Sequence, residues 1–314
     1  MTNIMFKLEH KVGVTLLLVF LAIFATQLVT RVYWVLPEMY KLEALADQKD
    51  KGRFHAALGA VSQRIAMLNY DNAVWDEVYY FNENPTTNFM EETFNTPDLF
   101  TSNGINGIVL FDKNGNSVWH VSKSSQDGQP LSLSWKYEEP NHPFTGVFVT
   151  SADVHNNNSR PVTNRGLLRT SMGVVLFAAT SVMHSNAVGK TNGTLVYWRF
   201  WDKKIEEDIT RLSGLTFTST QLSNQKASPL ALKMSRNALR NHNDELVFFL
   251  NDPNKIPVIQ IVVQLPQRGF NTDWFEPYVL AGILIALLAL LALRYFINEV
   301  LLHPLDSIRS HMLQ

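Results

Sequence analysis

The sequence predicts an α+β fold, in which an antiparallel sheet follows a long N-terminal helix and two transmembrane helices flank both. Three observations support this prediction. An uncharged apolar run lies near each end of the 314-residue chain, a stripe of helical period follows the first run, and short strand-like segments separated by turn residues fill most of the rest. The formal net charge of −1 is unlike the basic balance of nucleic-acid-binding proteins, and the lack of cysteine excludes disulfides and thiolate zinc sites.

The first apolar run covers residues 12–29 and contains no charged side chain. At 1.5 Å per residue such a helix is roughly 27 Å long, which is close to the thickness of the hydrocarbon core of a bilayer. The residues after it, "TQLVTRVYW", offer no small-x-small cleavage site, so a retained anchor is favoured over a cleaved signal peptide. We therefore expect a transmembrane helix over residues 12–31, after a short cytoplasmic segment at residues 1–11.

The second apolar run, "PYVLAGILIALLALLAL", begins at Pro277 and predicts a transmembrane helix over residues 277–297. Aromatic side chains flank this run, as in the interfacial belts of membrane proteins. They are Trp274, Phe275, Tyr278 and Tyr295.

The basic residues next to the two runs predict the orientation of the chain. Lys7 and Lys11 precede the first run, and Arg294 and Arg309 follow the second. Because positive residues favour the cytoplasmic side, both termini are expected inside and residues 32–276 outside. In a bacterial inner membrane the outside is the periplasm.

A long helix is expected to start near Pro37, since proline suits the first turn of a helix. Its apolar stripe has the spacing 4-3-4-3-4-3-4, which is a helical period near 3.5. The stripe consists of Phe54, Leu58, Val61, Ile65, Leu68, Asn72, Trp75 and Tyr79. It can pack against its own domain or against the same helix of a second copy, and the second option suggests a parallel homodimer.

A hairpin is expected next, with strands at residues 105–111 and 117–122. The turn between them contains Asp112, Asn114 and Asn116, which are residue types found in calcium loops. The spacing does not fit such a loop, because Gly115 comes too early and position 123 is lysine where the loop needs glutamate. A tight hairpin turn explains these residues better.

The remaining segments complete the predicted sheet. Residues 124–164 are rich in proline, serine and asparagine and are expected to form an exposed insertion or long loop. A short helix is expected at residues 203–214, with Ile205, Ile209 and Leu212 on its buried face. Further strands are expected at residues 166–171, 173–183, 193–202, 215–220, 245–252 and 256–265, all in one central sheet.

The segment "YDNAVWDEVYYF" resembles the D-x-A-x-W-D-x-x-Y-x-F helix of the fourth class of CHASE domains, which are extracellular sensors of bacterial and archaeal signalling proteins. The likeness extends over roughly residues 50–265. It implies a PAS/Cache-like antiparallel sheet with a long N-terminal helix, and the ligands of the family are generally unknown. This chain departs from the usual pattern at Asn72, where the family has tryptophan. The matching positions are Asp71, Ala73, Trp75, Asp76, Tyr79 and Phe81.

The C-terminal residues 298–314 resemble the opening helix of a HAMP linker, in which Pro-Leu follows a membrane helix. A 4-3-4 spacing of apolar residues in this segment is typical of a parallel coiled coil. The residues are Leu301, Leu305, Ile308 and Met312. Because a HAMP unit needs a second helix, the chain is expected to be the front part of a longer protein.

The sequence carries no recognisable catalytic motif. Its nine histidines have no metalloprotease or triad-like context, and there is no phosphate-binding loop or dinucleotide fingerprint. Asp71 and Asp76 are five residues apart, or about 140° around one helix, so they do not converge as an acid pair. We expect no catalysis, no metal and no cofactor in residues 1–314.

Ligand binding is a possible role for the aromatic helix motif. On one continuous helix Asn72, Asp76 and either Tyr79 or Tyr80 share a face, and Asp76 beside Trp75 suits an amine ligand. The alternative is that the rings fasten the helix to the sheet while Asp76 bonds a strand backbone or pairs with Arg199. The candidate ligand-binding residues are Asn72, Trp75, Asp76, Tyr79, Tyr80 and Arg199.

The expected function is that of a transmembrane signalling receptor. Its outer domain would sense a small molecule or a periplasmic binding protein and signal through the second membrane helix and the HAMP linker. By the resemblance, the missing output domain is expected to be of the GGDEF or EAL type, which makes or degrades cyclic di-GMP. A sensor histidine kinase and a structural anchor with an inert outer domain are the alternatives. The expected partners are the bilayer, a second copy of the chain and the sensed molecule, without nucleic acid.

Overall fold

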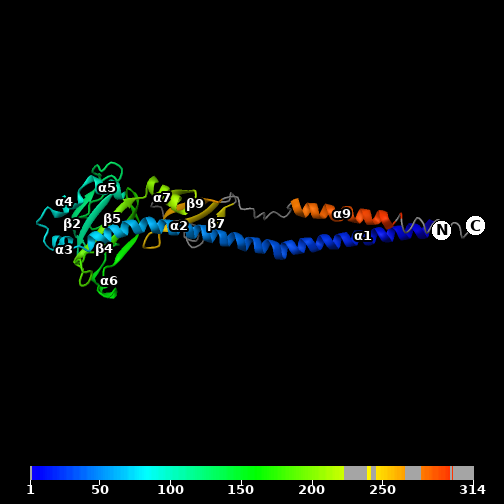
Figure 1. The fold of residues 1–314 in the computed structure, drawn as a ribbon, viewed down its shortest axis with the longest axis horizontal. Coiled ribbons are helices and arrows are strands. Elements are labelled where there is room, and N and C mark those ends of the chain that lie inside the picture. The colour runs from blue at the N-terminus through cyan, green and yellow to red at the C-terminus, as the bar shows by residue number, and fades with distance from the viewer. Residues whose placement is uncertain (1, 223–238, 242–244, 266–276, 298, 300–314) are drawn as a thin grey trace, which may run out of the picture. The chain divides into compact units, whose positions relative to one another are not determined.

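The computed structural model describes residues 2–222, 239–241, 245–265, 277–297 and 299, and the chain divides into two compact units (Figure 1). One unit comprises residues 1–46 with 268–314, and the other comprises residues 47–267. The predicted HAMP segment, including its four seam residues, lies outside the described part of the chain apart from residue 299.

The first unit consists of apolar helices. Helix α1 (Thr2–Thr30) continues through a π-helical stretch, η1 (Arg31–Val35), into α2 (Leu36–Ala73), so there is no separate start at Pro37. Helix α9 (Pro277–Phe296) lies beside α1 (Figure 1), where Gly282 approaches Gln27.

Within the described residues, one helix is long and apolar enough to cross a membrane, judged by length and composition. It is the run Lys11–Ala73, whose most apolar window has a mean hydropathy of 2.5. This supports the first predicted span. The apolar helix Leu280–Phe296 is shorter, so the second predicted span stays a prediction.

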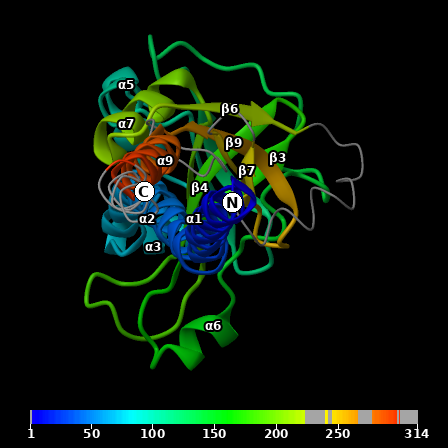
Figure 2. The same cartoon turned by 90° about the vertical axis from the view of Figure 1, so that its right-hand side faces the viewer.

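The second unit contains two antiparallel sheets, whereas one central sheet was predicted. The larger sheet has the order β2-β1-β5-β4-β3 and the smaller has the order β6-β9-β8-β7, with β6 beside β9 (Figure 2). The strands of the larger sheet are β1 (Gly107–Asp112), β2 (Ser117–Ser122), β3 (Thr163–Thr170), β4 (Gly173–Ser181) and β5 (Gly193–Phe200). Those of the smaller sheet are β6 (Phe217–Gln221), β7 (Leu239–Asn241), β8 (Glu245–Asn251) and β9 (Pro257–Gln264).

Short helices precede β1 or connect the strands. They are α3 (Asp76–Glu83), α4 (Phe89–Phe94), α5 (Pro97–Asn103), α6 (Ser151–Asn156) and α7 (Lys203–Ser213). Helices α3, α4 and α5 lie between α2 and β1, α6 lies between β2 and β3, and α7 lies between β5 and β6. Helix α7 occurs where it was predicted and buries Ile205 and Ile209. The prediction for Leu212 was wrong, because this side chain is 56% exposed and Ser213 takes the buried position at the end of the helix.

The larger sheet is buried on both faces. Along β1, Ile108 and Leu110 belong to one hydrophobic cluster, and Val109 and Phe111 belong to another. Successive side chains of a strand point to opposite faces, so the two clusters lie on opposite sides of the sheet. This explains why the strands read as continuous apolar runs rather than as alternating patterns.

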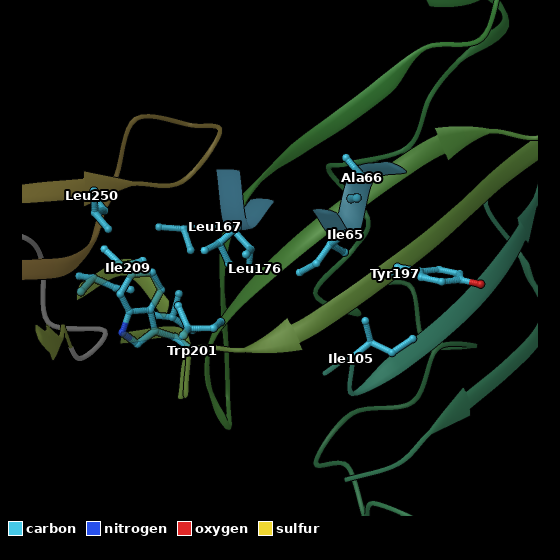
Figure 3. Close-up of a cluster of buried hydrophobic side chains, with 14 of the residues drawn as sticks. Ile65, Ala66, Ile105, Leu167, Leu176, Tyr197, Trp201, Ile209 and Leu250 are labelled. Carbon is cyan, nitrogen blue, oxygen red and sulfur yellow. The ribbon is translucent and has the colours of Figure 1, made fainter. Parts of the chain in front are cut away.

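Helix α2 packs its apolar stripe against its own domain. Phe54 contacts the rings of Phe217 and Phe248 edge-on at 5.0 and 5.1 Å, which joins the helix to the smaller sheet. Further along, Ile65 and Ala66 enter the same core as residues of both sheets (Figure 3). The stripe therefore packs in the core of its own domain, and it does not support a dimer formed by pairing of two α2 helices.

The predicted hairpin between β1 and β2 is present, and Asp112 organises its turn. The carboxylate accepts hydrogen bonds from the backbone N–H groups of Asn114 and Asn116, both at 2.8 Å, and from their side chains. Gly115 has a φ of 84°, which glycine adopts without strain. Because the donors come from the protein itself, the calcium interpretation is not needed here.

Residues 124–164 were predicted to be an exposed insertion or long loop, and the segment is mostly loop before α6, but its exposure was wrongly predicted for the aromatic residues. This segment lies on the second face of the larger sheet and buries Trp135, Tyr137 and Phe144 there. The hydroxyl of Tyr137 accepts a hydrogen bond from the indole of Trp198 on β5 at 3.0 Å. The polar composition concealed these rings because they follow neither a helical nor a strand period.

Protonation of His142 at acidic pH should destabilise the packing of this segment. The imidazole stacks on Phe111 at 5.0 Å, and its Nδ1 accepts the N–H of Phe144 at 3.1 Å, which requires a neutral ring. Burial lowers the pKa of His142 below its ordinary value of 6.5. Its contribution to stability is therefore complete above about pH 6.5 and is lost as the pH falls below that value. We expect the melting temperature of the wild type to fall more steeply between pH 7 and 5 than that of His142→Phe. Parallel curves would contradict this role.

Candidate functional site

The long helix ends inside the aromatic motif, contrary to the prediction of one helix through Tyr79. Helix α2 stops at Ala73, Val74 forms a parallel bridge with Met183, and the N–H of Met183 donates to the carbonyl of Ala73 at 3.1 Å. Trp75 is extended, with φ −139° and ψ 129°, and α3 begins at Asp76. The sequence contains no helix breaker here, so the pairing with the distant Met183 overrides local propensity.

The break places Asp76 at the first turn of α3, where it bonds to the loop after β4. Its Oδ1 lies 2.7 Å from Nδ1 of His184 and accepts the backbone N–H of Ser185 at 3.2 Å. In return the N–H of Asp76 donates to Oγ of Ser185 at 3.1 Å. A negative charge at this position also suits the positive end of the helix dipole. Asp76 and Ser185 thus connect the two segments reciprocally.

These bonds also fix the charge of the aspartate. The hydrogen bond from His184, followed by those from the backbone and side chain of Ser185, lowers the pKa of Asp76 below its ordinary value of 3.8. The carboxylate is therefore ionised at neutral pH.

Two tyrosine rings complete this arrangement around His184. The ring of Tyr79 stacks on the imidazole with centroids 3.8 Å apart, and Tyr80 approaches the same imidazole at 5.4 Å. Tyr80 is 59% exposed. We call Asp76, Tyr79, Tyr80, His184 and Ser185 the Asp76 cluster. It combines a carboxylate, an imidazole and two aromatic rings at the surface, a mixture that can hold a polar or cationic molecule.

The other predicted site residues do not join the Asp76 cluster. Trp75 packs on Phe89 with ring centroids 5.2 Å apart, which is the fastening role left open by the sequence. Asn72 points into the domain and donates to the carbonyl of Leu68 at 2.8 Å and to the hydroxyl of the fully buried Tyr197 at 3.0 Å. The shared face predicted for Asn72, Asp76 and the tyrosines was wrong, because the helix breaks between Asn72 and Asp76.

The suggested pair between Asp76 and Arg199 does not form either. Arg199 is buried and donates from Nη2 to Oδ1 of Asp202 at 3.0 Å. The same oxygen accepts the N–H of Ile205 at 2.8 Å and so caps α7. Arg199 therefore supports the start of α7 and does not take part in the Asp76 cluster, contrary to the ligand-binding role predicted for it.

The residues that sequence reasoning missed are His184 and Ser185. The available signal was weak: a histidine and a serine, in "SVMHSNA", come three and four residues after the end of the buried strand β4. Polar residues at the end of a buried strand are common, so only the structure identifies them as the partners of Asp76.

Two cavities in the described part of the chain are lined by other residues. One has a volume of about 410 Å³ and lies between α2 and β3. The other, of about 480 Å³, is lined by the packed loop segment, the end of β3 and the β8–β9 hairpin. The described residues contain no group of three or more His, Asp or Glu side chains suited to a metal ion.

The domain thus combines an α+β fold, a long N-terminal helix and the half-exposed Asp76 cluster. The CHASE4 domain matches residues 57–220, which is more than half of the chain, and the chain belongs to that family. This confirms the resemblance that the aromatic motif suggested.

The comparisons with solved structures give distant likenesses. A domain of a protein assigned to the sensory box/GGDEF family from Vibrio parahaemolyticus is 10% identical, with a TM-score of 0.45 over 74% of this chain and 99% of that one. The periplasmic domain of LuxQ from Vibrio cholerae is 11% identical, with a TM-score of 0.35 over 70% of this chain and 98% of that one. Superpositions at this level say nothing about what this chain binds. No curated protein matches the chain.

Proposed function

We propose that the protein is a transmembrane receptor whose CHASE4 domain senses an extracellular signal and passes it to a cytoplasmic output domain. The observation that carries this proposal is the Asp76 cluster. It joins α3 to the loop after β4 directly beyond the end of α2, and α2 belongs to the same helical run as the apolar membrane segment. A molecule that changes this connection changes the restraint on the end of that run and so shifts a two-state equilibrium.

The proposal includes two membrane spans, with both termini in the cytoplasm and residues 32–276 in the periplasm. The basic residues Lys7 and Lys11 before the first span and Arg294 in the last turn of the second support this orientation. We expect alkaline phosphatase fused after residue 180 to be active and the same enzyme fused after residue 314 to be inactive. The opposite pattern would overturn the topology and with it the sensory role outside the cell.

For the output, we propose a domain of the GGDEF or EAL type, reached through α9 and a HAMP linker. The membership in the CHASE4 family supports this choice, because such domains are usual outputs there. A histidine kinase output is the second candidate, since the family also serves kinases. The level of cyclic di-GMP in cells that express the full-length protein separates the two: an unchanged level points to the kinase.

A parallel homodimer also belongs to the proposal, since motion of a membrane helix is readily passed to a two-stranded linker. The stripe from Phe54 to Tyr79 does not serve as its interface, because Phe54 and Ile65 of that stripe are in the domain core. Crosslinking in membranes tests this point, and a purely monomeric pattern would remove the dimer from the proposal.

A further inference from the structure

The groove between α2 and β3 has the features of a second binding site, separate from the Asp76 cluster. It has a volume of about 410 Å³, which lies within the usual range for small-molecule sites. Residues Gln63, Met67, Tyr70 and Asp71 of α2 line one side, and Arg165 of β3 lines the other.

Among the residues that match the family motif, Asp71 alone is neither packed in the described core nor bonded to another described side chain. Ala73 and Phe81 are buried, Trp75 packs on Phe89, and Asp76 and Tyr79 contact His184. Asp71 is exposed, and none of the described residues forms a hydrogen bond or an ion pair with its carboxylate. Packing within the domain therefore does not explain why aspartate occupies this motif position, whereas binding of a ligand in the groove does.

The two charges of the groove have opposite signs and are well separated. Arg165 bonds to the side-chain oxygen of Gln63, which is neutral, so no described carboxylate balances its charge. Gln63 and Asp71 are eight residues apart on α2, which corresponds to about 12 Å along the helix axis. A free amino acid is too short to contact both charged ends, but an extended chain of about four residues at 3.3 Å per residue is long enough.

The wall between the charges is apolar, and one side is the edge of a sheet. Met67 is 58% exposed and Tyr70 is 38% exposed, although both are large hydrophobic side chains. Strand β3 ends the order of the larger sheet, and among the described residues its backbone pairs with β4 alone. An edge strand presents N–H and C=O groups that can pair with an extended peptide.

We propose that this groove binds a short peptide of about four residues with free ends. The N-terminal ammonium group pairs with Asp71, the C-terminal carboxylate pairs with Arg165, and the peptide backbone lies along β3 over Met67 and Tyr70. The ammonium group of a peptide is protonated at neutral pH, as the ion pair requires. This inference concerns binding alone and does not depend on the topology or the output proposed above.

Calorimetric titration of the purified chain in detergent tests the proposal, with tetra-alanine as the probe. We expect saturable binding of tetra-alanine, binding at least about tenfold weaker for free alanine, and binding about tenfold weaker for N-acetyl tetra-alanine. In Asp71→Asn the acetyl group should make no further difference, because the partner of the amine is already gone. Arg165→Gln should cancel the corresponding effect of C-terminal amidation.

Two variants serve as matched controls. Asp98→Asn removes an exposed carboxylate on α5, and Arg64→Gln removes an exposed guanidinium of α2 that does not line the groove. Both should bind tetra-alanine like the wild type. Absence of saturable binding to the wild type overturns the proposal, and so does a penalty for acetylation that is equal in the wild type and in Asp71→Asn. Because binding is read directly, a failure here leaves the signalling proposal untouched.

Discussion

Gly193→Ala should destabilise the outer domain by about 3 kcal/mol or more, the largest effect of a single methyl group that we expect in this chain. A Cβ at this position would overlap with the carbonyl oxygen of Phe111 and the side-chain nitrogen of Asn82. Both atoms are held in place, because that nitrogen of Asn82 donates to the carbonyls of Phe111 at 3.3 Å and Asn192 at 3.1 Å. The methyl group must therefore separate α3 from the pairing of β1 with β5.

Thermal unfolding of the purified protein measures this effect, and Gly59→Ala is the matched control. Gly59 lies within α2, and a Cβ there would meet no heavy atom within 4 Å. Alanine favours a helix over glycine by about 0.5–1 kcal/mol, so this variant should melt at a slightly higher temperature than the wild type. If Gly193→Ala and Gly59→Ala melt at similar temperatures, the close packing described around Gly193 is wrong.

The strands of this domain were predictable because each is a local pattern. "GIVLFD" and "GTLVYWRF" are short apolar runs bounded by turn residues, and they became β1 and β5 with Gly107 opposite Trp198. The sequence does not show why position 107 must be small. The structure does, since the indole of Trp198 covers it and leaves no room for a Cβ.

The candidate site was harder to predict because its contacts link residues far apart in the chain. Trp75, Asp76 and Tyr79 were selected as candidates because aromatic and acidic residues are concentrated in this motif. The relative positions predicted for their side chains assumed an unbroken helix. The bridge between Val74 and Met183 breaks that helix and turns Asp76 toward His184. No local sequence pattern encodes a bridge between residues over a hundred positions apart. The sequence could therefore predict that the motif fastens the helix to the domain, but it could not identify His184 as the partner of Asp76.

Helix-to-sheet fastening and sensing predict different consequences for the same substitution. A pair of half-exposed groups contributes little to stability, because solvent screens it. If the Asp76 cluster only fastened α3, its loss would leave both the fold and the output nearly unchanged. If it belongs to a two-state element, a small change in its energy redistributes the two states and changes the output several-fold.

Asp76→Ala should therefore change the output of the full-length protein by at least about threefold while lowering the melting temperature by no more than a few degrees. The substitution removes the acceptor used by His184 at 2.7 Å and by the N–H of Ser185 at 3.2 Å. The cellular level of cyclic di-GMP, or autophosphorylation if the output is a kinase, is the measurement. Asp98→Asn, an exposed carboxylate on α5, is the control and should leave the output unchanged.

His184→Ala should reproduce the change caused by Asp76→Ala, and the double variant should add nothing to either. Groups that act as one pair give non-additive effects, whereas independent groups give effects that sum. Tyr79 loses its stacking partner in His184→Ala, so Tyr79→Leu should move the output in the same direction. An output that stays at the wild-type level in folded Asp76→Ala, His184→Ala and Tyr79→Leu would show that the Asp76 cluster only fastens α3 and carries no signal.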